Sequence, residues 1–286
     1  MKRPSLLLAM LATLLALPLG GAAPTAAPAA ASTFAPSRFS VEVVGSGPDV
    51  ILIPGLTASR NVWRGTVAAL PGYRYHLVQV AGFAGEPARG NARGEVVAPL
   101  AEEISRYISA MRLVRPAIVG HSMGGTVAMM VAARHPERVG KTLVVDMLPQ
   151  PAGLLGGSAS GMRGLAGLLG GLGATESGRS LIDSAIRMFG NDRAENSRSD
   201  PDVVARATRE LAVTDLTPEL PRIATPLTVV YAVPDAARSA AIARAYAAAY
   251  SGKKGVRLVR VEESGHMIMY DQPAPFRSAL RAFLAG

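Results

Sequence analysis

The segment Gly120–Gly125, which reads Gly-His-Ser-Met-Gly-Gly, constrains the fold of this 286-residue chain more than any other feature. An apolar run at 116–120 leads into it, and a run with helical character at 126–134 follows it. The glycines that flank the serine fit a turn that is too tight for larger side chains. A serine at a sharp turn between a strand and a helix carries its hydroxyl at the carboxyl end of a sheet. This context therefore predicts that Ser122 is a nucleophile.

Segments with strand character alternate with segments of helical character through most of the chain. Such alternation is typical of a parallel sheet with helices on both faces, so we expect an α/β fold with a mostly parallel central sheet. The expected strands are 39–44, 49–54, 75–80, 116–120, 142–145, 227–233 and 256–261. The expected helices are 60–70, 95–111, 126–134, 236–250 and 274–284, the second of them starting late because of Pro99.

The alternation breaks at 149–221, where no strand pattern is present. Helical character returns near 179–189 and 201–211, so we expect a helical cap over the carboxyl ends of the strands. The flanking segments, 39–148 and 222–286, then form the core. Nine glycines interleaved with leucines at 153–173 are typical either of a moving lid or of a flexible connection, and both readings stay open.

Four pieces in this order resemble the α/β-hydrolase fold family, and the resemblance runs over nearly all of 39–286. They are Ile53–Thr57 with Trp63, Gly120–Gly124, Leu227–Asp235 and Gly265–Met267, the last followed by Asp-Gln-Pro. A single Gly-x-Ser-x-Gly pattern is a weak signal. The four pieces together are a strong one, because the order serine, acid, histidine is the one this fold uses.

The resemblance implies a catalytic triad of Ser122, Asp235 and His266. A serine hydroxyl becomes a good nucleophile only when a base takes its proton, and imidazole can do so near neutral pH. The aspartate would hold the imidazole in the correct tautomer. The resemblance also places the backbone N–H groups of Leu56 and Met123 as an oxyanion hole, although the loop reads Pro-Gly where many members have His-Gly.

Two of these positions have competitors. Asp146 ends the strand after the 126–134 helix, where some family members carry the acid, and it stays the alternative to Asp235. His121 is expected to pack beside the nucleophile in a structural role, which leaves His266 as the base. Asp271 is expected to start the last helix, because it stands two residues before a proline.

The predicted function is that of an exported serine hydrolase, which cleaves a carboxylic ester or related acyl bond of a small, apolar substrate through an acyl-serine intermediate. Other serine-triad chemistries on this fold remain alternatives: C–C bond hydrolysis, proline-type aminopeptidase activity and cofactor-free perhydrolase activity. A non-catalytic binding protein is the alternative outside enzymes.

Composition excludes several other classes. The chain has no cysteine, which removes disulfides and a cysteine nucleophile. Its net charge is +9, but the basic residues are dispersed and no aromatic residues interleave with them, so we expect no nucleic-acid partner. No metal-binding or dinucleotide-binding pattern is present in the sequence, and no cofactor is expected. No oligomeric state is predicted.

The first 31 residues have the pattern of a secretory signal peptide: Lys2-Arg3, an apolar run at 5–19, then small residues that end in Ala29-Ala30-Ala31. An uncleaved anchor is the alternative, but the apolar run is short for a membrane span. Residues 32–38 are expected to form a disordered linker. The mature protein is predicted to be periplasmic or secreted, with no stable membrane span.

Overall fold

The computed structural model describes residues 34–155 and 198–286, which carry a seven-stranded sheet in the order β1-β3-β2-β4-β5-β6-β7. β1 pairs with β3 in antiparallel orientation, and every other neighbouring pair is parallel. This confirms the expected α/β fold with a mostly parallel sheet. The strands are β1 (Phe39–Gly45), β2 (Asp49–Ile53), β3 (Arg74–Val80), β4 (Ala117–His121), β5 (Lys141–Val145), β6 (Leu227–Val233) and β7 (Arg257–Glu262).

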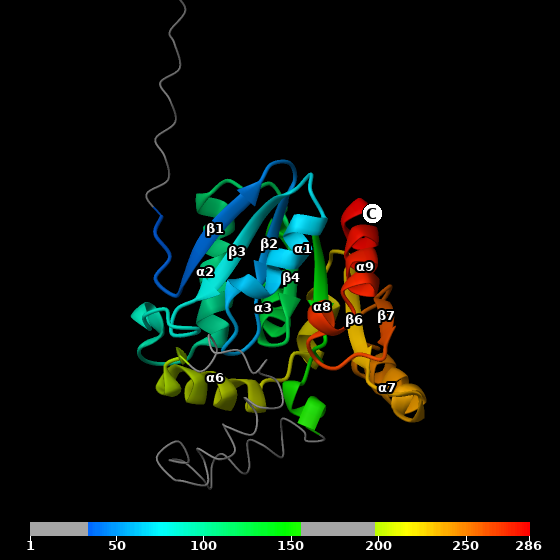
Figure 1. Ribbon diagram of the computed structural model, residues 1–286. Helices are drawn as coiled ribbons and strands as arrows, with labels where there is room; N and C mark the ends of the chain where they lie inside the picture. The colour runs from blue at the N-terminus through cyan, green and yellow to red at the C-terminus, as the bar shows by residue number, and fades with distance from the viewer. Residues whose placement is uncertain (1–33, 156–197) are drawn as a thin grey trace, which may run out of the picture. The chain divides into compact units, whose positions relative to one another are not determined.

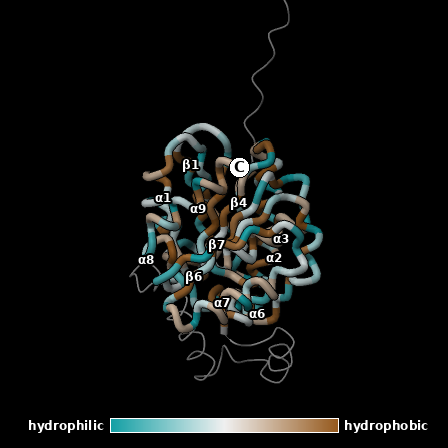
Figure 2. Tube along the Cα trace, turned by 90° about the vertical axis from the view of Figure 1, so that its right-hand side faces the viewer, coloured by the Kyte–Doolittle hydropathy of each residue, from teal (hydrophilic) through white to brown (hydrophobic). Residues whose placement is uncertain are grey.

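Helices cover both faces of the sheet (Figure 1). The central strands are almost wholly buried, which explains why they read as continuous apolar runs rather than alternating patterns. In Figure 2 the hydrophobic segments accordingly lie inside and the hydrophilic ones outside. One face carries α2 (Val97–Ala110), α3 (Met123–Arg134) and α7 (Ala236–Ala249), and the other carries α1 (Arg64–Ala69), α8 (Ile268–Asp271) and α9 (Pro273–Ala285).

The core consists of two apolar layers, one on each face of the sheet. Leu100, Val127 and Tyr250 belong to the larger layer, under α2, α3 and α7. Trp63 and Phe276 belong to the other, and their rings lie 6.3 Å apart between the segment before α1 and the start of α9. The predicted helix 60–70 is present as a 3₁₀ turn, η1 (Arg60–Trp63), that runs directly into α1.

The described part of the expected cap comprises η4 (Pro151–Leu155), α6 (Pro201–Val213) and η7 (Thr217–Arg222). α6 lies across the carboxyl end of the sheet, below the strands in Figure 1. The Glu210 carboxylate accepts hydrogen bonds from the backbone N–H groups of the first turn of α2, at 2.7–2.8 Å. A negative charge there stabilises the helix start, so this contact holds α6 against the first turn of α2.

Several predictions lie outside the described residues. They are the signal peptide at 1–31, the helix at 179–189 and most of the glycine-rich segment at 153–173. Among the described helices, none combines the length and the apolar character needed to cross a membrane.

The predicted disordered linker at 32–38 is wrong at its last residues. The Glu103 carboxylate of α2 accepts hydrogen bonds from the Ser37 amide, the Ser37 hydroxyl and the Arg38 amide, at 2.7–3.1 Å. Three donors on one buried carboxylate hold this segment against the core, so the ordered part begins before β1. The short helix α8 was not expected from the sequence.

Candidate functional site

Ser122 stands on a strained turn between β4 and α3. Its backbone has φ 54° and ψ −123°, a region that non-glycine residues rarely adopt and that costs about 1–3 kcal/mol. Its amide donates to the Val145 carbonyl at 2.9 Å, which ties the turn to the end of β5. A Cβ at Gly120 would overlap the Gly124 carbonyl, and one at Gly124 would overlap the Ile53 carbonyl. The flanking glycines are therefore required by close backbone approach, as predicted.

The loop after β2 lies directly against this turn. A Cβ at Gly55 would lie 3.1 Å from the Ser122 Cβ, so the absence of a side chain there lets the loop approach the serine. The next amide is that of Leu56, and the first amide of α3 is that of Met123. Within the part of the chain that the structure describes, neither amide donates a hydrogen bond to another residue. This arrangement leaves both as donors for an oxyanion, which is the role predicted for them.

Ser199, in the segment before α6, makes a hydrogen bond to the same loop. Thr57 has φ 61°, and its carbonyl accepts a hydrogen bond from the Ser199 hydroxyl at 3.3 Å. The Ser199 hydroxyl in turn accepts a hydrogen bond from the Ala84 amide at 2.9 Å. No sequence pattern marks this contact, which links the loop after β2, the loop after β3 and the segment before α6.

His266, in the loop after β7, pairs with Asp146 at the end of β5. Its Nδ1–H donates to Asp146 Oδ2 at 2.8 Å, and both side chains are largely buried, at 12% and 10% exposure. In this tautomer Nε2 is the acceptor nitrogen of the neutral ring. A carboxylate on one ring nitrogen and a basic second nitrogen is the arrangement that a general base requires.

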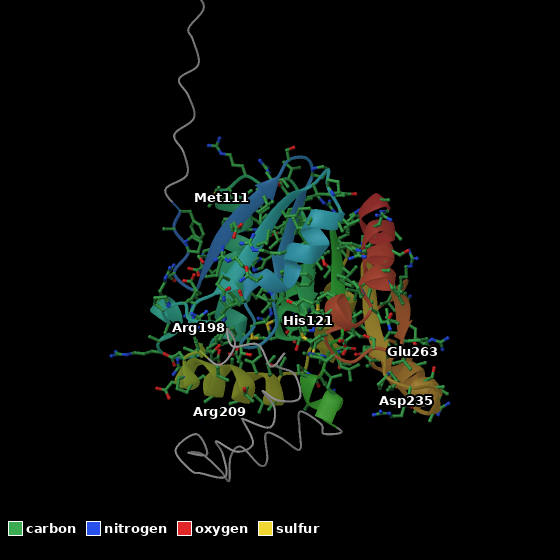
Figure 3. All side chains as sticks on the ribbon, viewed as in Figure 1. Met111, His121, Arg198, Arg209, Asp235 and Glu263 are labelled. Carbon is green, nitrogen blue, oxygen red and sulfur yellow. The ribbon has the colours of Figure 1, made fainter. Side chains whose placement is uncertain are left out.

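The structure contradicts the preference for Asp235 as the partner of His266. The register pairs Val145 with Val230, so Asp146 lies level with Tyr231, whereas Asp235 stands four positions after Tyr231. Its side chain is 42% exposed and caps α7 by accepting a hydrogen bond from the Arg238 amide at 3.0 Å. The Arg238 guanidinium also donates to it, which lowers the pKa of the carboxyl group. Figure 3 places Asp235 beside α7, apart from His121.

A cue for this outcome is present in the sequence. Asp235 immediately precedes a predicted helix, the position at which aspartate acts as an N-cap. Asp146 instead follows the apolar pair Val144-Val145, a context in which a carboxylate is buried and needs partners.

His121 has the structural position expected for it. Its Nε2–H donates to the His266 carbonyl oxygen at 3.0 Å, and the two imidazole rings lie 4.7 Å apart. Complete burial, with a smaller contribution from His266, lowers the pKa of His121 to about 3. The ring therefore stays neutral near pH 7, and it connects the residue before Ser122 to the loop that carries His266.

Asp271 has a different role from the helix start predicted for it. Its carboxylate accepts a hydrogen bond from the Gly265 amide at 3.0 Å, while α9 begins at Pro273. Asp271 thus closes the loop around His266. Among the described residues, no group of three or more histidine, aspartate or glutamate side chains is arranged to hold a metal ion.

Comparisons with known proteins identify the family and the fold. The family model described as "Alpha/beta hydrolase family" matches residues 50–279. A pimeloyl-[acyl-carrier protein] methyl ester esterase from Aeromonas hydrophila is 38% identical over 112 residues, which are 38% of this chain and 42% of that protein. The protein of the same name from Vibrio atlanticus is 35% identical over 109 residues, 38% of this chain and 40% of that protein. The matches thus span about two fifths of these relatives.

Solved structures resemble the chain over a greater length. An enol-lactonase from Burkholderia xenovorans superposes with a TM-score of 0.65 at 20% identity, covering 87% of this chain and 96% of that one. An esterase from Exiguobacterium antarcticum has a TM-score of 0.62 at 22% identity, with coverage of 87% and 96%. At these identities the likeness establishes the shared fold.

Proposed function

Because the chain belongs to the alpha/beta hydrolase family, we propose that it is a serine hydrolase that cleaves carboxylic esters through an acyl-Ser122 intermediate. The single observation that carries this proposal is the junction of β4 and β5. There Ser122, in a strained turn, directly follows His121, whose ring lies 4.7 Å from that of His266, and the Nδ1–H of His266 donates to the buried Asp146. The named relatives and neighbours, three esterases and a lactonase, support the same reaction class.

In the proposed mechanism, His266 Nε2 takes the hydroxyl proton of Ser122 as Oγ attacks the ester carbonyl. Asp146 stabilises the imidazolium that forms, since its Oδ2 accepts the Nδ1–H. The Leu56 and Met123 amides bind the developing oxyanion. His266 then protonates the departing alcohol. Water, activated by the same ring, releases the carboxylic acid and restores Ser122.

The relatives point to the class of substrate to test first. Their name specifies a methyl ester of an acyl group, but the matched segments span only about two fifths of each protein. We therefore propose an acyl ester as the substrate class, without a carrier-protein partner. The reaction type is tested by measuring kcat/KM for methyl and p-nitrophenyl esters of increasing acyl length. The same measurement on an aminoacyl amide and on a C–C substrate tests the alternative chemistries.

The direct test is Ser122→Ala assayed with p-nitrophenyl acyl esters. We expect kcat to fall by about 10⁴-fold or more, because the nucleophile is removed. Ser105→Ala is the matched control: Ser105 is equally buried, lies on α2, and its Oγ makes no hydrogen bond within the described residues. We expect wild-type kcat for that variant. Equal turnover by Ser122→Ala and wild type would contradict the proposal.

We also propose that the protein is exported. The support is the sequence alone: a basic start, an apolar run at 5–19 and a small-residue cleavage pattern ending at Ala31. Mass spectrometry of the protein expressed from its full sequence should give a chain that starts at Ser32, directly after Ala31, or close to it. A chain that starts at Met1 and stays in the cytoplasm would contradict export while leaving the hydrolase proposal intact.

A further inference from the structure

The two carboxylate oxygens of Asp146 have separate partners. Oδ2 accepts the Nδ1–H of His266 at 2.8 Å. Oδ1 accepts two hydrogen bonds, one from the Ala232 amide at 3.0 Å and one from the Tyr246 hydroxyl at 2.9 Å. The residue is only 7% exposed and has a positive φ of 49°. A buried carboxylate with a donor on each side has little freedom to rotate about its Cβ–Cγ bond.

Tyr246 lies on α7 and is itself held rigidly. Its ring stacks on Tyr231 with a centroid distance of 4.4 Å and an interplanar angle of 17°. The ring of Tyr250, at the C-cap of α7, lies nearly parallel to it with a centroid distance of 6.4 Å. Tyr246 is 3% exposed, and its buried hydroxyl donates to Asp146 Oδ1.

The hydroxyl is also held in its protonated form. Burial, reinforced by the negative charge of Asp146, raises the pKa of Tyr246 well above its usual value of 10. Tyr246 is thus a permanent hydrogen-bond donor at neutral pH. It lies outside the catalytic groups themselves, because its hydroxyl reaches only the side of Asp146 that faces away from His266.

We propose that Tyr246 is a positioning residue that sets the rotation of the Asp146 carboxylate so that Oδ2 faces His266. This inference rests on the proposed function. The Ala232 amide alone is a single donor and fixes one oxygen without fixing the plane of the carboxylate. A second donor from another element fixes that plane, and a group held by two such contacts orients its partner more strictly. A helix that follows β6 thus supports an acid that ends β5.

The test is Tyr246→Phe, which removes one oxygen atom and keeps the stacked ring. We expect kcat for the p-nitrophenyl ester to fall by about 10-fold with KM nearly unchanged, because the change affects the base rather than substrate binding. The acid limb of the pH profile of kcat/KM should also move to lower pH, since a misaligned carboxylate stabilises the imidazolium less.

Tyr250→Phe is the matched control. Tyr250 is the C-cap of the same helix, is similarly buried, and donates its hydroxyl to the carbonyl of Met147, the residue after Asp146, at 2.7 Å. We expect a similar decrease in Tm for both variants, but a kcat within about twofold of wild type and an unshifted pH profile only for Tyr250→Phe. Equal kcat losses without a pH shift would assign both tyrosines to packing and overturn the proposal.

A double variant tests whether Tyr246 acts through Asp146, separately from the proposed hydrolase function. In an Asp146→Asn background, Tyr246→Phe should cost less than about twofold further in kcat, because the hydroxyl acts through Asp146. A full additional 10-fold loss would contradict this route. Wild-type kinetics for Tyr246→Phe together with an inactive Ser122→Ala would remove only the positioning role. An active Ser122→Ala would instead remove the proposed function.

Discussion

Asp146 and Asp235 follow the carboxyl ends of two neighbouring strands, β5 and β6, yet one is buried and the other is exposed. Asp146 is buried, has partners on both oxygens, and faces His266. Asp235 is 42% exposed at the side chain, caps α7 and pairs with Arg238. The difference follows from register, because β6 extends past the end of β5 and carries its aspartate beyond the level of the histidine. The end of a strand therefore does not by itself place an acid in a site.

Removing each carboxylate in turn tests the difference between Asp146 and Asp235 most directly. We expect Asp146→Asn to lower kcat by about 10³–10⁴-fold, because the imidazolium loses its counter-charge and the tautomer is no longer fixed. Asp235→Asn should change kcat by less than about twofold, since asparagine keeps the cap and the carboxylate that it replaces bonds to Arg238. Steady-state kinetics with one p-nitrophenyl ester compares the two. A larger loss from Asp235→Asn would reverse the assignment.

The buried site around Asp146 and His121 should also lose stability at acid pH. The pKa of His121 is lowered to about 3 by burial, whereas in the unfolded chain it is near 6.5. The unfolded state thus binds more protons between these values, and stability falls as pH decreases from about 6.5 toward 3. Between pH 7 and pH 4 this contribution is about 3 kcal/mol.

His121→Gln removes that titration and retains a side-chain donor for the His266 carbonyl. Urea unfolding at pH 7 and pH 4 should therefore show a smaller loss of unfolding free energy in the variant than in wild type, whatever their difference at pH 7. His76, whose pKa is also lowered by burial, is present in both proteins and contributes equally. An identical pH dependence in the two proteins would mean that His121 is not the titrating group.

Breaking the exposed pair of Asp235 and Arg238 should have the smallest effect on activity and stability. Asp235 has its pKa lowered by Arg238, so its stabilising contribution is complete above the unfolded pKa near 3.8 and is lost only as pH falls through the lower folded value. Arg238→Gln should leave kcat within about twofold and lower Tm slightly at low salt. The Tm difference should vanish at high ionic strength, because water and ions screen an exposed pair. A salt-independent decrease would contradict the surface assignment.

The sequence predicts the fold well because the central strands are buried on both faces and helices such as α2 and α9 have one apolar face. Ser122 and His266 are also predictable, since a strand–turn–helix serine and a histidine loop are local patterns. The partner of His266 is not local. It depends on how far β6 extends past β5, which the strand pattern does not give. Tyr246 and Ser199 act through contacts that join distant segments, and no local pattern marks them.

The most direct test of the account is a proton NMR spectrum of the far-downfield region, where the Nδ1–H of a histidine bonded to a carboxylate resonates. The account predicts a resonance from the His266–Asp146 hydrogen bond in the wild type and in Asp235→Asn, and its loss in Asp146→Asn. A resonance that persists in Asp146→Asn and disappears in Asp235→Asn would contradict the claim that Asp146 is the partner of His266.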